Sequence, residues 1–594
     1  ILLALAWTVQ VQEKDGGDRE ALSLIDRALK VLPYNYILLR EKTMLAITLS
    51  DRKALSEVIA VYRFLAPTWT WDLATETRQQ LELFDREAKG PWRADFQDSA
   101  VLLNNLLMAD PWYDRDRNEA DPRDSYIGKP VARFLRLEPL QPEASPPDHE
   151  LQFEAAKLQD KPADAISDRK WDVAIPIWLS RDAKPTIFVA DAREVREVSK
   201  NGTTLPFPGG PKPLPPSVHG VLAVDLDNDF RTDFVFAGAG GLRFFLQGPN
   251  GEFTDVTAET GLDPAIVDAD YFGVWAVEFT MSGDLDLVVA PRTGAPFVLK
   301  NNRDGTFNVE RPFTELDGVR AFVWADLKQS GFPNAVFLDA KGKLHYFANK
   351  RHGLFREQPL PENLGRFVAL AVGDLGSGAF EIIALREEGA LQGLAFNSKT
   401  KAWHIEEIAR WPDFPSGAEP GPYHIVLADL DNNGALDLIA SGSAGTRIWL
   451  GAERGGFTAL SSSATVFGAA PLHEDGRLDL LALSKEGLPT ELINHGKERY
   501  HWLDLRLRAA ADEDGKVLPL VRHRINSFAL GGEIECRAGL WAQKQIIADA
   551  IVHIGLGTHS QLDLLDIDWP NRLHRAERGL KSGQNLEITQ PIPW

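Results

Sequence analysis

Two stretches of this 594-residue sequence decide the fold: residues 221–236 read VLAVDLDNDFRTDFVF, and residues 425–439 read IVLADLDNNGALDLI. In each stretch an acidic turn joins two apolar runs, which predicts a strand, a tight loop and a second strand. Oxygen-bearing side chains occupy positions 1, 3, 5 and 9 of each turn. Alternate residues of a tightly curled loop point inward, and Ca²⁺ takes about six to eight oxygen ligands. The spacing therefore predicts a calcium site in each loop.

The expected ligands are the four side chains of each loop together with the main-chain carbonyl at position 7. The first set is Asp225, Asp227, Asp229, Arg231 and Asp233, and the second set is Asp429, Asp431, Asn433, Ala435 and Asp437. An EF-hand is excluded because Phe236 or Ala440 replaces the acid required at position 12, and because strands flank the turn. Without a cation, the four acids of the first loop would repel one another at close range.

The same frame of strand, turn and strand recurs along the chain with fewer ligands. Position 1 falls at seven residues: Trp178, Asp225, Glu278, Asp326, Asp374, Asp429 and Pro471. Their successive spacings are 47, 53, 48, 48, 55 and 42 residues. Periods near fifty residues, with several short strands each, are typical of β-propeller blades, so about seven blades are expected. The five degenerate copies are interpreted as tight turns; in one of them Lys328 would bring an ammonium group towards the cation.

Residues 171–496 resemble the FG-GAP, or VCBS-type, repeats of the integrin α-subunit propeller. Phe272-Gly273 before one turn and Ala290-Pro291 after it look like the motif that names this family, and Phe467-Gly468 recurs. The two intact DxDx[DN]xxxD loops make the resemblance specific. In that family the calcium loops join strands within a blade, so the resemblance implies two structural Ca²⁺ sites. The proline-rich stretch Leu205–Pro216 is expected to be an exposed insertion.

Residues 1–137 are predicted to be helical, because their apolar residues recur at helical spacing. A shift of 34 residues maps Ala21 onto Leu55, Ile25 onto Ile59 and Pro33 onto Pro67. This is the period of tetratricopeptide (TPR) repeats, and the segment resembles that family. Two repeats are expected, with a candidate degenerate third at Leu81–Ala109; an unrelated helical bundle is the alternative. Residues 138–170, rich in proline, glutamate and alanine, are interpreted as a linker or an arm on the surface.

Residues 497–594 begin a new β-rich pattern. The runs His553-Ile554-Gly555-Leu556-Gly557 and Ile567-Asp568-Trp569-Pro570-Asn571 resemble the core of the ASPIC/UnbV domain, which follows FG-GAP repeats in cartilage acidic protein-like proteins. Ile554 stands where that family has an aromatic residue, and Asn571 where it usually has serine. The expected fold is mainly β: an integrin-α-like propeller of about seven blades between a TPR-like helical segment and a small β-rich ASPIC/UnbV domain.

The composition narrows the classes of function. With 64 Lys and Arg against 85 Asp and Glu, the net charge is −21, which would repel the phosphate backbone, so no nucleic-acid partner is expected. The single cysteine, Cys536, excludes an intrachain disulfide or a CxxC zinc site. No run of eighteen or more apolar residues predicts a transmembrane segment. The opening Ile1–Trp7 has no initiating methionine and reads as a chain cut upstream, so an export signal would not be visible.

These observations favour a non-catalytic, calcium-binding protein of the extracellular space, the periplasm or the cell surface. Its propeller loops and helical repeats would contact a protein or glycan ligand, as in cell adhesion. Trp541, Trp569 and Trp594 could form a sugar-binding face, although tryptophans more often lie in a core. One alternative is a structural subunit of a surface filament, layer or larger complex, formed by self-assembly. The other is a propeller-based lyase or hydrolase, which a cluster of His, Tyr or Arg in the central channel would favour; no hydrolase or P-loop motif is present.

Overall fold

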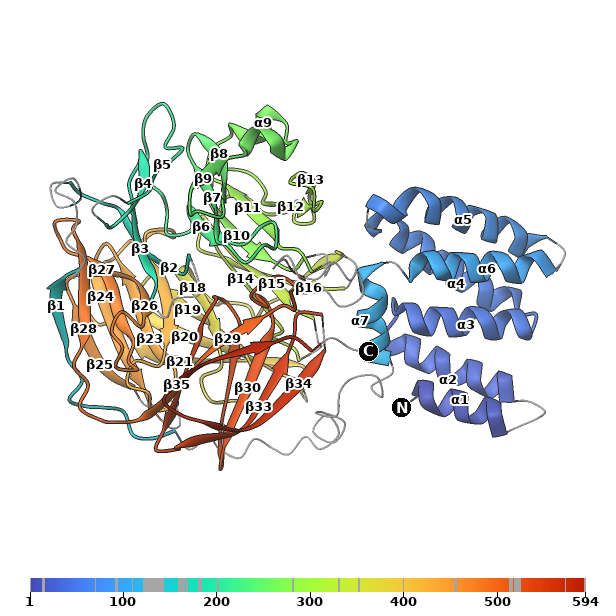
Figure 1. Ribbon diagram of the computed structural model, residues 1–594. Helices are drawn as coiled ribbons and strands as arrows, with labels where there is room; N and C mark the ends of the chain where they lie inside the picture. Colours follow the sequence, from blue (N-terminus) through green and yellow to red (C-terminus); the bar gives the residue numbers. More distant parts are fainter. Residues whose placement is uncertain are drawn as a thin grey trace.

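Helices come first along the chain, a ring of sheets follows, and a smaller pair of sheets ends it (Figure 1). The computed structural model describes residues 2–12, 17–69, 71–90, 94–108, 110–120, 144–158, 166, 169–179, 184–199, 202–279, 283–329, 332–350, 353–398, 400–452, 457–511, 517, 525–571 and 573–591.

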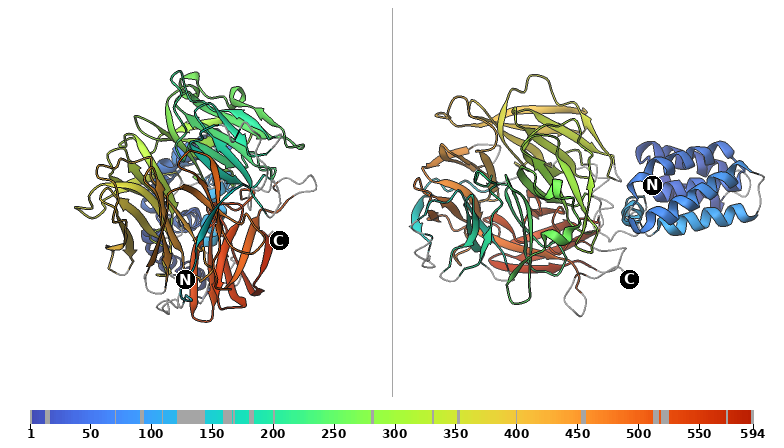
Figure 2. Two further views of the ribbon diagram at one scale, coloured as in Figure 1. Left: turned by 90° about the vertical axis from the view of Figure 1, so that its left-hand side faces the viewer. Right: turned by 90° about the horizontal axis from the view of Figure 1, so that it is seen from above.

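The N-terminal helices form an array in which each helix from α1 to α6 packs against the next. The array contains α1 (Leu2–Gln12), α2 (Gly17–Val31), α3 (Tyr36–Thr48), α4 (Arg52–Leu65), α5 (Trp71–Lys89), α6 (Ala94–Leu107) and α7 (Pro111–Ala120), with a 3-10 turn, η1 (Ala66–Thr68), after α4. Asn35 and Asp51 cap α3 and α4, because their side chains accept hydrogen bonds from the first free N–H groups of each helix. Figure 2 shows that the array stands at one side of the ring.

The shift of 34 residues in the sequence carries α2 onto α4, with α3 between them. Ala21, Ile25, Leu55 and Ile59 are all buried, so the predicted helical faces are confirmed. Helix α2 ends at Val31, two residues before Pro33 as predicted. The segment proposed as a third repeat, Leu81–Ala109, contains the end of α5 and all of α6.

Seven four-stranded antiparallel sheets form a ring like that of a propeller (Figures 1 and 2). Numbered along the chain, blade 1 is β2 (Val173–Ile177), β3 (Thr186–Ala190), β4 (Glu194–Glu197) and β5 (Thr204–Pro206); blade 2 is β6 (Val221–Val224), β7 (Asp233–Gly238), β8 (Gly241–Gln247) and β9 (Phe253–Asp255). Blade 3 is β10 (Tyr271–Val277), β11 (Asp286–Pro291), β12 (Phe297–Asn301) and β13 (Phe307–Glu310); blade 4 is β14 (Val319–Ala325), β15 (Asn334–Asp339), β16 (Leu344–Asn349) and β17 (Phe355–Gln358). Blade 5 is β18 (Phe367–Gly373), β19 (Glu381–Arg386), β20 (Ala390–Asn397) and β21 (Ala402–Arg410); blade 6 is β22 (His424–Ala428), β23 (Asp437–Gly442), β24 (Gly445–Gly451) and β25 (Phe457–Ser462). Blade 7 is β26 (Thr465–Ala470), β27 (Asp479–Leu483), β28 (Pro489–Asn494) and β1 (Phe153–Lys157).

The predicted number of blades is confirmed, and so is the place of each repeated turn. In every blade the turn joins the first strand to the second. In six blades position 9 is the first residue of the second strand, as Asp233 is of β7 and Asp437 is of β23, whereas the turn of blade 5 is one residue shorter and Glu381, its position 8, begins β19. A short 3-10 turn, η2 (Thr257–Thr260), and a short helix, α9 (Pro264–Val267), lie between blades 2 and 3. Blades 7 and 1 meet through contacts of β2 with β26 and β27, which closes the ring.

The range 138–170 differs from the expected linker in one respect. Its strand β1 pairs antiparallel with β28 from Phe153–Asn494 to Lys157–Thr490, as the fourth strand of blade 7. A strand of only five residues, without alternation of apolar and polar residues and within a proline-rich stretch, gave no pattern by which to recognise it. The blade that ends the ring is therefore completed by a segment that precedes the ring in the sequence, and hydrogen bonds between the two tie the ends of the propeller together.

The expected insertion Leu205–Pro216 is exposed only in part. Leu205 belongs to β5 and is buried, and Phe207 packs with its ring 6.1 Å from that of Phe236. Residues 211–215 are exposed. The prolines were correct indicators of an irregular loop, but two apolar side chains anchor its start in the core between blades 1 and 2.

The C-terminal strands form two sheets that lie along one side of the ring (Figure 1). One sheet contains β32 (Val552–Gly557), β29 (His501–Arg508) and β35 (Gln584–Thr589), and the other contains β31 (Trp541–Ile546), β30 (Glu533–Ala538), β33 (Gln561–Asp568) and β34 (His574–Lys581). Their shared core buries Trp541, Trp569 and Cys536. The first two tryptophans of the suggested sugar-binding face are thus core residues, and Trp594 lies outside the described residues.

Helix α7 joins the helical array to both other regions. The Trp112 ring stacks on that of Phe332 in blade 4, with centroids 5.7 Å apart. The guanidinium of Arg115 lies over both rings, at 5.5 and 5.0 Å, and its Nη1 donates to the carbonyl of Pro570 at 2.8 Å. One continuous hydrophobic cluster extends from the helices into blades 3 and 4. The array is therefore attached at a corner where blade 4 and the C-terminal domain meet.

Replacing Trp112 with alanine should destabilise this attachment by about 3–5 kcal/mol, because it empties a buried aromatic site. The measurement is guanidinium unfolding followed by far-UV circular dichroism, in which the helical transition should shift to lower denaturant. Leu102→Ala is the control, since Leu102 is 52% exposed on α6. Equal midpoints for the two variants would contradict a stabilising role for this contact.

Candidate metal centres

The turns between the first and second strands of the blades gather on one face of the ring, because all blades have the same orientation and connection. We name them after their blades: loop 2 (residues 225–233), loop 3 (278–286), loop 4 (326–334), loop 5 (374–381), loop 6 (429–437) and loop 7 (471–479). The two predicted metal sites are loops 2 and 6.

Loop 2 brings three predicted ligands together. Asp225, Asp227 and Asp229 each offer a carboxylate oxygen, and these oxygens lie within 4.8 Å of one another. Asp225 accepts hydrogen bonds from the main-chain N–H of Asp229 at 3.2 Å and of Phe230 at 2.5 Å. Asp233 has other hydrogen-bond partners. Its two carboxylate oxygens accept from the main-chain N–H groups of Leu226 and Gln247, both at 2.8 Å. Loop 2 is thus a preformed cup of three carboxylates, with Asp233 fixing the loop to β8.

Arg231 was expected to contribute only its carbonyl to loop 2. Its guanidinium also forms an ion pair with Asp229, and its Nε donates to the carbonyl of Gln247 at 2.8 Å. This contact offsets part of the negative charge of the cup. Loop 6 has Ala435 at the same position, so its acids have no such partner within the loop.

Loop 6 brings Asp429, Asp431 and Asp437 together, again with carboxylate oxygens within 4.8 Å of one another. All three side chains are buried. Asn433, the other predicted ligand, uses its Oδ1 to accept from the N–H of Ala435 at 2.7 Å and its Nδ2 to donate to the carbonyl of Gly451 at 2.8 Å. Position 1 repeats the pattern of loop 2: Asp429 accepts from the N–H groups at positions 5 and 6.

Burial is the main cause of the raised pKa values of the aspartates in both loops. It raises the pKa of Asp225 to about 7 and that of Asp233 to about 8, and in each case a neighbouring aspartate raises it further. In loop 6 burial raises the pKa of Asp431 to about 6 and holds those of Asp429 and Asp437 well above their usual range. A bound divalent cation would favour the ionised carboxylates and release the protons.

The donor sets fit a hard divalent cation. The two clusters consist of carboxylate oxygens, which suit Ca²⁺ or Mg²⁺, and contain no thiolate or imidazole. The two cups differ in access: Asp227 of loop 2 is exposed to solvent, whereas the corresponding Asp431 of loop 6 is buried.

The degenerate loops balance their charges by other means. Burial raises the pKa of Glu278 in loop 3 to about 7 and that of Glu381 in loop 5 to about 7. Lys328 in loop 4 turns onto the rings of Tyr346 and Phe396, at 4.8 and 4.5 Å. Positions 3 and 5 of loop 3 and position 5 of loop 4 lie outside the described residues.

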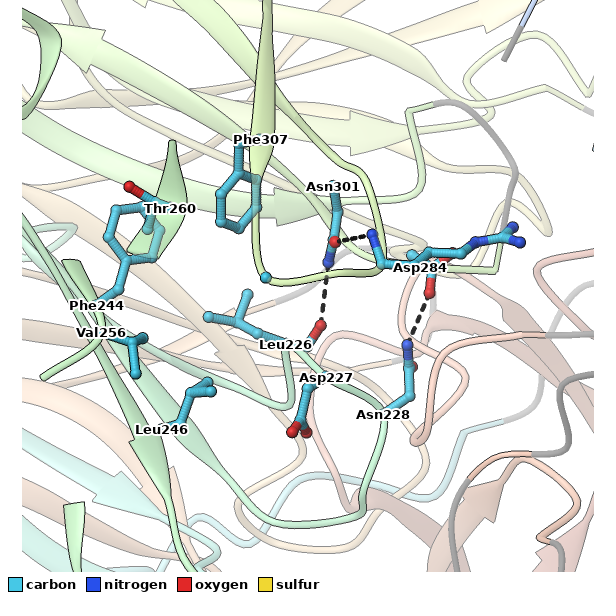
Figure 3. Close-up of a pocket in the computed structure, with 12 residues that line it drawn as sticks. Leu226, Asp227, Asn228, Phe244, Leu246, Val256, Thr260, Asp284, Asn301 and Phe307 are labelled. Atoms are coloured by element: carbon cyan, nitrogen blue, oxygen red, sulfur yellow. Dashed lines mark hydrogen bonds and ion pairs between the residues drawn. The ribbon is translucent and has the colours of Figure 1, made fainter. Parts of the chain in front are cut away.

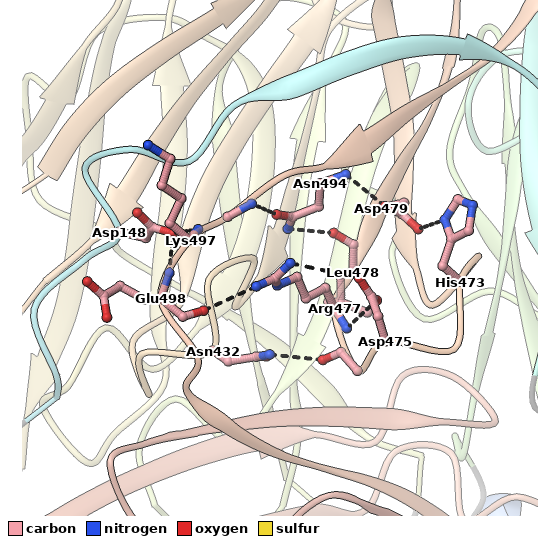
Figure 4. Close-up of polar contacts among 12 residues, drawn as sticks. Asp148, Asn432, His473, Asp475, Arg477, Leu478, Asp479, Asn494, Lys497 and Glu498 are labelled. Atoms are coloured by element: carbon pink, nitrogen blue, oxygen red, sulfur yellow. Dashed lines mark hydrogen bonds and ion pairs between the residues drawn. The ribbon is translucent and has the colours of Figure 1, made fainter.

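Loop 7 holds a third cluster, which the sequence reading took for a plain turn. His473 at position 3 places Nδ1 2.8 Å from Asp479 (Figure 4). The same nitrogen lies 3.3 Å from Glu491 of β28. The hydrogen bond to Asp479 raises the pKa of His473. The same three side chains are grouped closely enough to hold a metal ion. Glu491 escaped the sequence reading because it lies on the neighbouring strand rather than in the loop.

A pocket of about 50 Å³ lies between blades 2 and 3 beside loop 2 (Figure 3). Phe244, Leu246 and Phe307 supply part of its apolar wall, and Asp227 lies at its polar edge. The amide of Asn228 donates to Asp284 at 2.8 Å. Asp227 therefore takes part in both the carboxylate cup and the pocket.

Comparison with known proteins identifies one domain. Residues 524–592 match the ASPIC and UnbV family, so the chain is a propeller-like protein with a C-terminal ASPIC/UnbV domain. No curated protein matches the chain. No helix among the described residues has the length and apolarity needed to cross a membrane.

Among the solved structures that this chain resembles are two with low sequence identity and low TM-scores. A lectin from Agrocybe aegerita, which recognises non-reducing terminal N-acetylglucosamine, is 16% identical with a TM-score of 0.35, over 52% of this chain and 91% of its own. BBS1N, solved in complex with ARL6DN, is 13% identical with a TM-score of 0.38, over 60% of this chain and 99% of its own. Likeness at this level carries no argument about function.

The loop 7 cluster should make stability depend on pH. Because the folded-state pKa of His473 is raised above its unfolded value of about 6.5, its contribution is present below that value and is lost as pH rises through the folded pKa. In urea unfolding, the wild type should therefore lose stability relative to His473→Gln as pH rises above about 6.5. His404→Gln is the control, since His404 is 69% exposed. A pH profile shared by the wild type and His473→Gln would contradict the ion-pair role.

Proposed function

We propose that this protein is a non-catalytic, calcium-binding protein of the extracellular space, the periplasm or the cell surface, with Ca²⁺ in loops 2 and 6. The observation that carries the proposal is the cup of three buried carboxylates in loop 6: Asp429, Asp431 and Asp437. Burying several like charges together is costly unless a cation neutralises them. Millimolar extracellular Ca²⁺ makes even weak sites of this kind useful, which supports the proposed location.

Two surfaces support a role in binding a protein or glycan. The first is the exposed side of loop 2, where Asp227 borders the apolar pocket between blades 2 and 3. An ion held there would have a side open to oxygen atoms of a ligand, as its loop 6 counterpart would not. The second is the helical array, which exposes Val31, Met44 and Phe64. Helical arrays present such surfaces to partner chains, in line with the TPR-like period.

The enzyme alternative depends on reactive groups near the central channel. His219 precedes β6, and His424 begins β22. Burial lowers the pKa of His219 to about 3 and that of His424 to about 4, so both are neutral at pH 7. His424 Nε2 faces the carbonyl of Val466 at 2.7 Å, and the His219 ring lies 4.9 Å from that of Trp275. These contacts suit packing, and we retain the non-catalytic proposal.

Calcium should raise the thermal stability of the full chain, and EDTA should lower its melting temperature by several degrees. At a concentration of about 100 times Kd, one site adds about 2.7 kcal/mol to the free energy of unfolding. Asp437→Asn should weaken binding to loop 6 and reduce the shift, whereas Asp413→Asn, an exposed acid on another loop, should not. The measurements are differential scanning calorimetry and calcium titration calorimetry. An unchanged melt together with a flat titration of the wild type would overturn the proposal.

The alternative of a structural subunit makes a different prediction. A monomeric binder should keep one mass in size-exclusion chromatography with light scattering, with or without calcium. A subunit of a filament or layer should form larger species, and their growth with protein concentration would favour that alternative.

A further inference from the structure

The C-terminal domain contacts the leading acids of three loops. The hydroxyl of Ser527 donates to Asp225 of loop 2 at 2.5 Å. The amide of Asn526 donates to Glu278 of loop 3 at 2.9 Å, and the main-chain N–H of Lys544 donates to Asp374 of loop 5 at 3.1 Å. Each of these acids is position 1 of its loop. Two of the donors, Asn526 and Ser527, are adjacent in the sequence and contact neighbouring loops, and the third, Lys544, belongs to β31.

Gly555 of strand β32 lies directly against Asp429, the leading acid of loop 6. A Cβ atom at Gly555 would lie 2.0 Å from the carboxylate of Asp429, so only glycine fits this approach. The N–H of Gly557 donates to the carbonyl of Asn432 at 2.8 Å. His553 places Nε2 2.6 Å from Oδ1 of Asn432 and Nδ1 2.6 Å from Asp504. The run from His553 to Gly557 thus fits the main chain of loop 6 directly.

An aromatic side chain lies at or against position 6 in three of the loops. In loop 6 it is Gly434, whose carbonyl accepts from Trp541 Nε1 at 2.8 Å, and in loop 7 it is Gly476, against which Trp502 packs. In loop 2 it is Phe230, which has a left-handed φ of 64°. Its ring lies 4.1 Å from the Arg508 guanidinium, so the aromatic contact is made from the propeller side. The N–H at position 6 donates to the carboxylate at position 1 in loops 2 and 6, which links the two contact points.

We propose that the C-terminal domain covers the leading acids of the cation sites in loops 2 and 6, leaving the Asp227 side of loop 2 open, and that ion binding and docking of this domain are thermodynamically linked. Ser527 and Trp541 are the positioning residues of the cover. The inference rests on the proposed binding of Ca²⁺ and adds a role for it: the ions hold the C-terminal domain on the propeller.

The sign of the linkage follows from desolvation. Docking leaves Asp225 and Ser527 only 2% and 1% exposed, and it places Gly555 against Asp429. Burying carboxylates is unfavourable unless their charge is balanced, and a divalent cation balances it. The ion therefore favours the docked state, and by reciprocity the docked domain increases the affinity for the ion.

Hydrogen–deuterium exchange of the full chain, with Ca²⁺ and with EDTA, tests the first half of this linkage. The reporters are the amides of Lys544 and Gly557, which donate across the interface. Their exchange should accelerate about 10-fold or more in EDTA, as a linkage free energy of typical size implies. Strand β34 (His574–Lys581), an edge strand of the C-terminal domain, is the internal control and should change little.

Calcium titration of two matched pairs of variants tests the second half. Ser527→Ala should weaken calcium binding about 10-fold, because it removes a hydrogen bond to a charged group, whereas Ser560→Ala, at an exposed serine of the same domain, should not. Trp541→Phe should weaken binding about 5-fold by removing the donor to Gly434. Its control, Trp569→Phe, alters a buried tryptophan of the same core that has no contact with position 6 of a loop among the described residues.

The outcomes separate this inference from the function on which it rests. If the wild type binds calcium but EDTA leaves the exchange of Lys544 and Gly557 unchanged, and each variant binds like its control, the linkage is overturned and the calcium sites stand. If the wild type gives no heat with calcium, the proposed function and the linkage are both overturned. Faster exchange in EDTA, together with weaker binding in Ser527→Ala and Trp541→Phe alone, supports the linkage.

Discussion

The carboxylates buried in the turns between first and second strands need their negative charge balanced. This constraint governs the face of the propeller on which these turns lie. The same turn recurs in every blade, and in loops 2, 3, 5 and 6 its leading acid accepts main-chain N–H groups and so shapes the loop. Each copy then needs a partner for the charge that this geometry buries. Arg231 supplies part of it in loop 2, and His473 supplies it in loop 7. Loop 6 has three buried acids and no basic side chain among its own residues, so it gives the strongest argument for a bound ion.

The same face explains how three regions become one molecule. The C-terminal domain covers the loops, strand β1 completes blade 7, and α7 contacts both blade 4 and Pro570. The segment that follows the helices also lies there, because the N–H of Asp148 donates to Asp431 at 2.7 Å. The carboxylate of Asp148 accepts from the main-chain N–H of Glu498 at 3.0 Å (Figure 4). Loop 6 is therefore both a local turn and part of an interface among segments that are distant in the sequence.

Much of the fold could be predicted from local pattern. Position 9 of six of the repeated turns begins a second strand, and the shift of 34 residues relates α2 to α4, because both patterns reflect a local structural unit that repeats along the chain. The assignment of 138–170 missed β1, which has no alternating pattern and is a strand only because β28 offers it an edge. Arg231 was read as a carbonyl ligand alone, since nothing in a sequence tells whether a guanidinium will turn back onto Asp229.

The sequence by itself determined the backbone of the loops and their carboxylates, because hydrogen bonds between residues four or five apart depend only on spacing. It also determined the number of blades, which follows from a repeat. Only the tertiary structure decided which carboxylates are buried and which loop keeps a side open to solvent. It also decided that Ser527 and Gly555 contact the leading acids and that Trp541 contacts Gly434. Burial depends on packing between segments separated by 100 to 300 residues, as Trp541 and Gly434 (107 apart) and Ser527 and Asp225 (302 apart) are, and no local pattern encodes such a contact.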